Sequence, residues 1–116
     1  MDLLFKNPTF HDGLNWTCRK GSKWFDVDCP PEGFPVIDTN HSDKVLGFAH
    51  SEYRTFSKFR EIKNSDFSKQ HDPNCRNYDD LLKEMQKLYP GFTEEYEVTI
   101  IFFEFVPVSE NPKKEE

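Results

Sequence analysis

The sequence predicts an α+β fold, namely a small mixed β-barrel with one main helix packed against it. Residues 96–106 form an apolar run that is hydrophobic on both faces at its centre, as in a strand covered on both sides. Several shorter strand patterns precede it, and residues 77–89 carry one strong helical pattern. The chain has 116 residues with 12 Phe, 4 Tyr and 2 Trp, which suits a single domain with an aromatic core.

The strand pattern at residues 16–20 separates its side chains into two groups. Successive side chains of a strand point to opposite faces, so Thr17 and Arg19 share one face while Trp16 and Cys18 share the other. We expect the tryptophan and the cysteine to face the core. The threonine and the arginine are then free to face a cleft.

The remaining elements are short strands, connections and helical segments. In chain order they are a strand at 3–5, a loop at 30–35, a strand at 36–38, a turn at 40–43, a strand at 44–53, a short helical turn at 56–62 and the main helix. The main helix has an N-cap at Asn77, apolar residues at helical spacing, and a stop at Pro90. Its acids are interpreted as solvent-facing, and these are Asp79, Asp80 and Glu84. We expect one domain at 1–106 and a disordered charged tail at 107–116.

The net charge of -6 is distributed unevenly along the chain. Residues 1–24 and 44–76 carry a positive balance, whereas residues 25–43 and 77–116 carry a negative one. The overall charge argues against bulk adhesion to nucleic acid, but the two cationic segments can still form one local positive site. The longest apolar run is too short to span a membrane and no signal segment is evident, so we expect a soluble, cytoplasmic monomer.

The cysteines and histidines form no recognisable pattern. Cys18, Cys29 and Cys75 are odd in number and lie far apart, which favours reduced structural thiols over a disulfide framework or a zinc site. The four histidines are scattered as well, and no Cys/His pair for nucleophilic catalysis is indicated. We therefore expect neither a metal nor a cofactor.

Four segments resemble the ASCH domain family in their order and spacing, over about residues 1–106. The segments are GLNWTCR at 13–19, FREIKNSDF at 59–67, LYPG at 88–91 and VTIIFF at 98–103. The resemblance implies a PUA-like β-barrel with a cleft that binds RNA or modified nucleosides. One branch of the family hydrolyses N4-acetylcytidine to cytidine.

The chain departs from the motif of that hydrolase branch, which has Gly, any residue, Lys, four residues and Arg, with a Thr two residues before the Arg. Thr17 and Arg19 match the end of the motif, but the lysine position holds Leu14, or Asn15 if one residue is skipped. Neither side chain can take a proton from a threonine hydroxyl. The branch also has a glutamate before its Tyr-Pro helix, where Asp72 is the nearest acid here. These departures favour binding over catalysis.

The resemblance and the residue types together predict a site for a nucleobase, a nucleoside or a short single-stranded RNA. Arginine can hold a phosphate or a base edge with two hydrogen bonds, and an exposed tryptophan can stack on a base. Glu104 lies on an alternating face of the last strand and could accept from a base amino group. The predicted ligand-binding residues are Thr17, Arg19, Lys20, Lys23, Trp24 and Glu104.

Two other interpretations remain open. In the first, the protein is an amidohydrolase for N4-acylated cytidine, with Thr17 as the nucleophile and Lys23 as the base. In the second, it is an adaptor whose acidic surface at 26–43 and main helix bind a basic protein partner. Trp24 also has a structural alternative, since it could pack across one end of the barrel.

Overall fold

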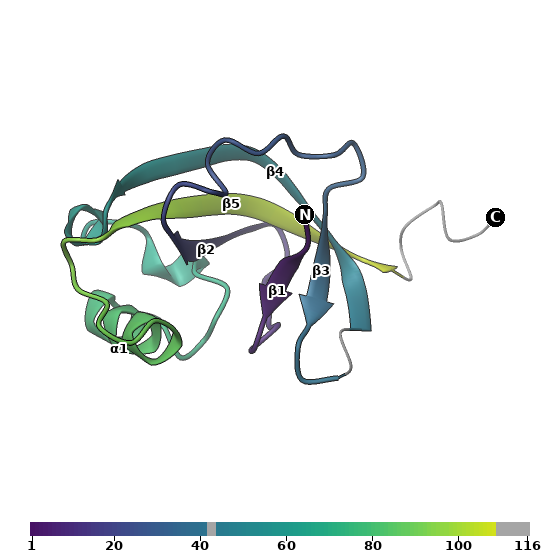
Figure 1. Cartoon of the computed structure of the whole chain (residues 1–116). Coiled ribbons are helices and arrows are strands. Elements are labelled where there is room, and N and C mark those ends of the chain that lie inside the picture. Colours follow the sequence, from purple (N-terminus) through teal and green to yellow (C-terminus); the bar gives the residue numbers. More distant parts are fainter. Residues whose placement is uncertain (42–43, 109–116) are drawn as a thin grey trace.

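A mixed five-stranded sheet curls into a half-barrel, and one α-helix packs beneath one end of it (Figure 1). This architecture comes from a computed structural model that describes residues 1–41 and 44–108. The strands are β1 (Leu3–Phe5), β2 (Leu14–Lys20), β3 (Phe34–Asp38), β4 (Lys44–Lys58) and β5 (Glu97–Pro107). The helices are the 3-10 turns η1 (Phe59–Ile62) and η2 (Phe67–Lys69) and the α-helix α1 (Tyr78–Leu88). The predicted small α+β barrel with one main helix is therefore confirmed at this coarse level.

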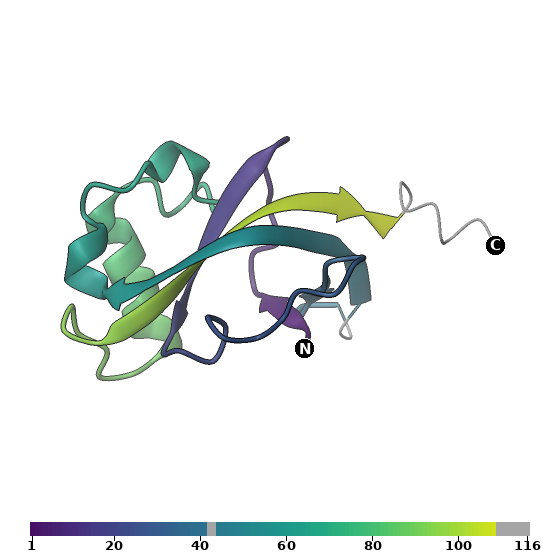
Figure 2. The same cartoon turned by 90° about the horizontal axis from the view of Figure 1, so that it is seen from above.

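Two long strands form the centre of the sheet. β4 and β5 pair antiparallel along most of their length, and Figure 2 shows them curving side by side across the molecule. The sheet order is β1-β3-β4-β5-β2, with β1 parallel to β3 and the other neighbours antiparallel. β1 and β2 are thus the two edges of the curled sheet.

The sheet buries a different hydrophobic core on each of its faces. On the α1 side, Trp16 and Val98 pack with residues of the helices, including Met85. Inside the curl, Phe34 and Phe103 pack with residues of β1 and with Trp24. Alternating residues of β5 enter the two cores, which explains why its sequence is apolar on both faces.

The main helix forms as its sequence predicts. The side chain of Asn77 accepts a hydrogen bond from the backbone amide of Asp80 at 2.8 Å, as an N-cap does. At the other end, the amide of Tyr89 donates to the carbonyl of Met85 at 2.8 Å, and Pro90 follows. The helix buries Leu81 and Met85 against the sheet. No helix among the described residues is long and apolar enough to cross a membrane.

The prediction from the sequence placed the start of one helical turn too early and missed one short 3-10 turn. Phe56 belongs to β4 rather than to a helical turn, because pairing with β5 continues as far as the Lys58 to Glu97 pair. The 3-10 turn η2 was not predicted; its N-cap Asp66 accepts from the backbone amide of Ser68. β5 extends to Pro107, one residue into the predicted tail. The rest of that tail from 109 onward, and residues 42–43 of the predicted turn, lie outside the described residues.

Candidate functional site: a cavity between β1, β2 and α1

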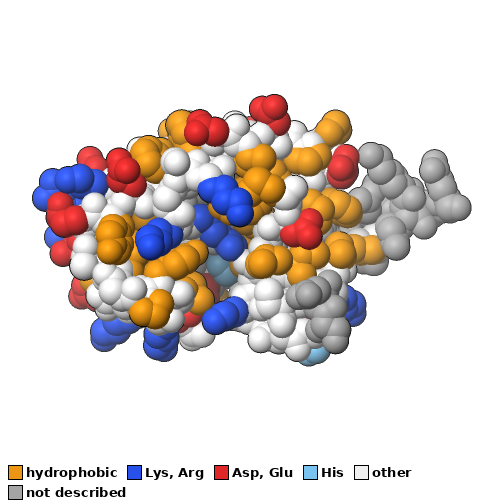
Figure 3. Space-filling model, in the orientation of Figure 1, with side chains coloured by type: hydrophobic (Ala, Val, Ile, Leu, Met, Phe, Trp, Pro, Cys, Tyr) orange, Lys and Arg blue, Asp and Glu red, His pale blue; other side chains and the backbone are white. Residues whose placement is uncertain are grey.

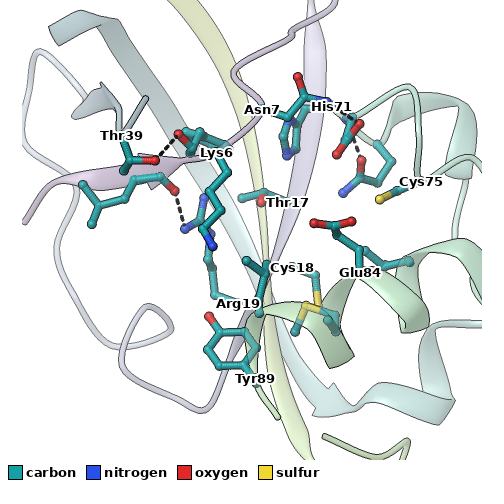
Figure 4. Close-up of a pocket in the computed structure, with 17 residues that line it drawn as sticks. Lys6, Asn7, Thr17, Cys18, Arg19, Thr39, His71, Cys75, Glu84 and Tyr89 are labelled. Carbon is teal, nitrogen blue, oxygen red and sulfur yellow. Dashed lines mark hydrogen bonds between the residues drawn. The ribbon is translucent and has the colours of Figure 1, made fainter. Parts of the chain in front are cut away.

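A cavity of about 340 Å³ lies where the two cores meet, between the β1 edge, strand β2 and helix α1. Figure 3 shows a hollow near the middle of this face, with Lys and Arg side chains around it and most Asp and Glu side chains farther away. The lining residues that carry polar or reactive groups are Lys6, Asn7, Thr17, Cys18, Arg19, Thr39, Gln70, His71, Asp72, Cys75, Glu84 and Tyr89. Figure 4 draws them as sticks and labels ten of them.

Arg19 is held against the β1 edge by its neighbours. One terminal nitrogen donates to the backbone carbonyl of Leu4 at 2.7 Å, and the guanidinium carbon lies 4.6 Å from the centre of the Phe5 ring. Its Nε is buried and has no hydrogen-bond partner among the described residues. Burial lowers the pKa of the guanidinium to about 10, but it stays charged at neutral pH.

Thr17 forms the middle of the cavity floor. Its side chain is buried, and its hydroxyl makes no hydrogen bond within the described part of the chain. The two side chains that alternate with it, Trp16 and Cys18, are buried in the core beside α1, as the strand pattern predicts. The indole of Trp16 donates to the carbonyl of Asp66 at 2.8 Å, so this ring anchors η2 and does not face the cavity.

A loop of residues 70–72 supplies acceptor groups on the other side of the cavity. The loop is tied to β2 because the amide of His71 donates to the carbonyl of Trp16 at 3.1 Å. Asp72 is buried, and its Oδ1 accepts from Asn7 at 2.7 Å and from the amide of Asn74 at 2.8 Å. The Asp72 carboxylate also accepts a hydrogen bond from the Cys75 thiol, so it acts as an acceptor on this side of the cavity.

His71 is a neutral acceptor in this cavity. Burial lowers its pKa to about 4, which keeps the ring uncharged at neutral pH. Nδ1 lies 3.1 Å from the carbonyl oxygen of Thr9, and since a carbonyl only accepts, Nδ1 carries the proton. Nε2 is therefore a bare acceptor. The ring packs edge-on to Phe5, with centroids 4.8 Å apart, so its orientation is fixed.

Glu84 brings a carboxylate to the cavity from α1. Figure 4 shows it pointing from the helix toward the cavity centre, on the side of Thr17 opposite to Lys6. The sequence analysis interpreted Glu84 as a solvent-facing helix residue, and the structure corrects this. The residue follows Leu81 by three positions and precedes Met85, so it sits at the border of the buried stripe.

The two cavity cysteines are not activated nucleophiles. Cys18 and Cys75 are both buried free thiols. Burial raises the pKa of Cys75 to about 12 and that of Cys18 above its ordinary value, so both stay protonated at neutral pH. The neutral His71 lines the same cavity but makes no hydrogen bond to either thiol in the described residues. A thiolate mechanism is therefore not favoured by this geometry.

Asn15, which stands at one of the two positions aligned with the family lysine, has a structural role. It is fully buried, and its amide group bonds the backbone of His11 in both directions, at 2.8 and 3.0 Å. It also donates to the carbonyl of Gly13, whose φ of 80° requires glycine. Asn15 thus holds the turn before β2 and does not line the cavity as the structure describes it.

The cavity brings together two of the six predicted ligand-binding residues, Thr17 and Arg19. Among the described residues that line it, the other four do not appear. Lys20 lies 5.0 Å from the ring of Tyr96, and Lys23 is exposed. Trp24 is buried in the second core, 5.0 Å from Phe34, which matches its structural alternative. Glu104 lies in a separate concavity.

The sequence analysis missed several cavity residues because their patterns carry no local signal. Lys6 simply follows the first strand, and His71 and Glu84 looked like a scattered histidine and a helix acid. Each reaches the cavity only through long-range packing. Within the described ranges there is no group of three or more His, Cys, Asp or Glu residues that could hold a metal ion.

Comparison with known proteins adds no relative to this description. No protein-family model matches the chain, and neither curated proteins nor solved structures give a match. The ASCH resemblance therefore stays a prediction from the sequence motifs.

Proposed function

We propose that the protein is a PUA-like, ASCH-type domain that binds one nucleobase-containing small molecule in the cavity beside β2. The observation that carries this proposal is the polarity of the cavity. Arg19 supplies donors at the β1 side, whereas His71 and Asp72 supply acceptors on the other side. An amino group of a nucleobase can donate to these acceptors, while acceptor atoms elsewhere in the same ligand can take the hydrogen bonds that Arg19 donates.

The size of the cavity supports a small ligand rather than a polymer. Its volume of about 340 Å³ is at the low end of the range of about 300–1,000 Å³ that is common for small-molecule sites. The apolar part of the lining comes from α1, through Leu81, Met85 and Leu88, and from β1, through Leu4 and Phe5. A flat ring bordered by these side chains would bury its apolar faces away from water, while the edge of the ring meets the polar groups.

Binding measurements with the purified protein test this function. We expect isothermal titration calorimetry to detect binding of a nucleoside or nucleotide. An oligonucleotide should bind with an affinity little higher than that of the best mononucleotide. Thr17→Val removes the free hydroxyl with little change of shape and should weaken binding by about tenfold, since one hydrogen bond contributes about 1 kcal/mol or somewhat more. Thr17→Ser keeps the hydroxyl and is the matched control. Undetectable binding of every nucleoside and nucleotide would reject the proposal.

A second candidate function is hydrolysis of an N4-acyl group from cytidine-type nucleosides. The observation that favours it is that the free Thr17 hydroxyl and the Glu84 carboxylate line one cavity. Thr17 would attack the acyl carbon while Glu84 takes its proton and passes it to the departing amine of cytidine as the C–N bond breaks, and water would then hydrolyse the acyl-threonine ester. Lys23, the base expected from the sequence, does not line the cavity as described. Incubation with N4-acetylcytidine and chromatography decides this candidate. Cytidine formed by the wild type and by Thr17→Ser but not by Thr17→Val would support it, and no cytidine above buffer background would end it.

A further inference from the structure

Arg19 is a desolvated cation without a counter-charge. It takes part in no ion pair among the described residues, and its partners are a backbone carbonyl and an aromatic ring. The buried Nε has no partner in that part of the chain. A partly desolvated charge is costly unless something compensates it, and a ligand anion in the cavity would do so.

Lys6 adds a second positive charge on the same side. It follows β1 directly, is exposed, and lines the cavity together with Arg19. Figure 4 shows both side chains on the β1 side, away from Glu84 and Cys75. The backbone of Lys6 is fixed because its carbonyl accepts from Asn40 at 2.5 Å. Two cations at one end, one half-buried and one exposed, suit the oxygens of a phosphate group.

We infer that the Arg19 and Lys6 end of the cavity binds a phosphate, so that the ligand is a nucleoside monophosphate rather than a free nucleoside. The inference rests on the proposed function and specifies the orientation of the ligand in the cavity. Asp72 and Glu84 at the opposite end repel phosphate by their charge, and they accept hydrogen bonds from a base amino group. The phosphate and the base therefore occupy opposite ends of one cavity.

Calorimetry with cytidine, cytidine 5′-monophosphate and inorganic phosphate tests this inference. We expect the nucleotide to bind at least about tenfold more tightly than the nucleoside, because charge-assisted hydrogen bonds are the strong ones. Lys6→Gln should remove much of that difference, because it should weaken nucleotide binding far more than nucleoside binding. Lys23→Gln removes the same charge from an exposed lysine outside the cavity and should change neither affinity.

The possible results separate the inference from the proposed function. Equal binding of nucleoside and nucleotide would overturn the phosphate end and leave nucleobase binding intact. Phosphate binding as tight as nucleotide binding would overturn the nucleobase function. Equal losses with Lys6→Gln and Lys23→Gln would show a diffuse charge effect and also overturn the phosphate end.

A direct observation of Arg19 avoids variants that disturb folding, since its guanidinium also holds the β1 edge. In a ¹H–¹⁵N spectrum, the Nε–H resonance of Arg19 should shift on addition of the nucleotide. Addition of cytidine alone should leave it nearly unchanged. A resonance that responds equally to both ligands, or to neither while the nucleotide binds, would contradict the inference.

Discussion

Two concave regions within the described part of the chain, the cavity beside β2 and a more open concavity across β4 and β5, differ in what they can do. The cavity beside β2 is the smaller, at about 340 Å³ against about 460 Å³ for the concavity lined by Tyr53, Phe102 and Glu104. Yet in the larger one Tyr53 is 62% exposed and Leu14 is 45% exposed, whereas in the smaller one Thr17 and His71 are buried. Burial positions polar groups and removes their water, so the smaller cavity is the better binding site.

Among the tests of this comparison, a substitution of Asp72 should have the largest effect on stability. Asp72→Ala removes two charge-assisted hydrogen bonds inside the cavity and should lower the free energy of unfolding by about 3 kcal/mol. Urea denaturation measures this loss. Asp72→Asn keeps an acceptor of the same shape, so it should retain most of the stability while weakening nucleotide binding. An unchanged midpoint for Asp72→Ala would mean that the cavity wall is not held by this carboxylate.

The pH dependence of folding gives the second test. The pKa of His71 is about 4 because the ring is buried, so between about pH 6.5 and 4 the unfolded state binds more protons than the folded state. The free energy of unfolding should therefore keep its full contribution from His71 above about pH 6.5. It should fall by at most about 3 kcal/mol as the pH drops to about 4. Arg19 and His11 also lower this pKa, whereas Asp72 raises it.

Denaturation curves at several pH values measure that loss. His71→Gln removes the titrating group and should flatten the dependence over this pH window. A wild-type curve that is already flat between pH 6.5 and 4 would show that the ring is less buried in solution than in the structure. A slope that survives in His71→Gln would assign the effect to another group.

The open concavity provides the smallest expected effect. Glu104→Gln and Tyr53→Ser change exposed side chains, and exposed substitutions usually alter stability by no more than about 0.5 kcal/mol. Neither should change nucleotide affinity. Calorimetry and urea denaturation on both variants check this. A marked loss of affinity with Glu104→Gln would restore the role that the sequence analysis gave this residue and would break the comparison.

The turn after β2 explains why neighbours in sequence are separated in space. Gly21 adopts a φ of 82°, and its carbonyl accepts from the Thr99 hydroxyl at 2.7 Å, so the chain turns away from the cavity directly after Lys20. Trp24 then enters the second core. The predicted ligand-binding residues of this segment are therefore divided, since Thr17 and Arg19 line the cavity and Trp24 lies in the second core.

Local patterns in the sequence determined the strand alternation of Thr17 and Arg19, the Asn77-capped helix, and the two-sided burial of β5. These features follow from the period of each element and from hydrogen bonds between close neighbours. Only the tertiary structure decided which partners share the cavity with the threonine and the arginine. Lys6 arrives from the opposite edge of the curled sheet and Glu84 from the helix, and both arrive because burial of two separate cores folds those elements onto β2.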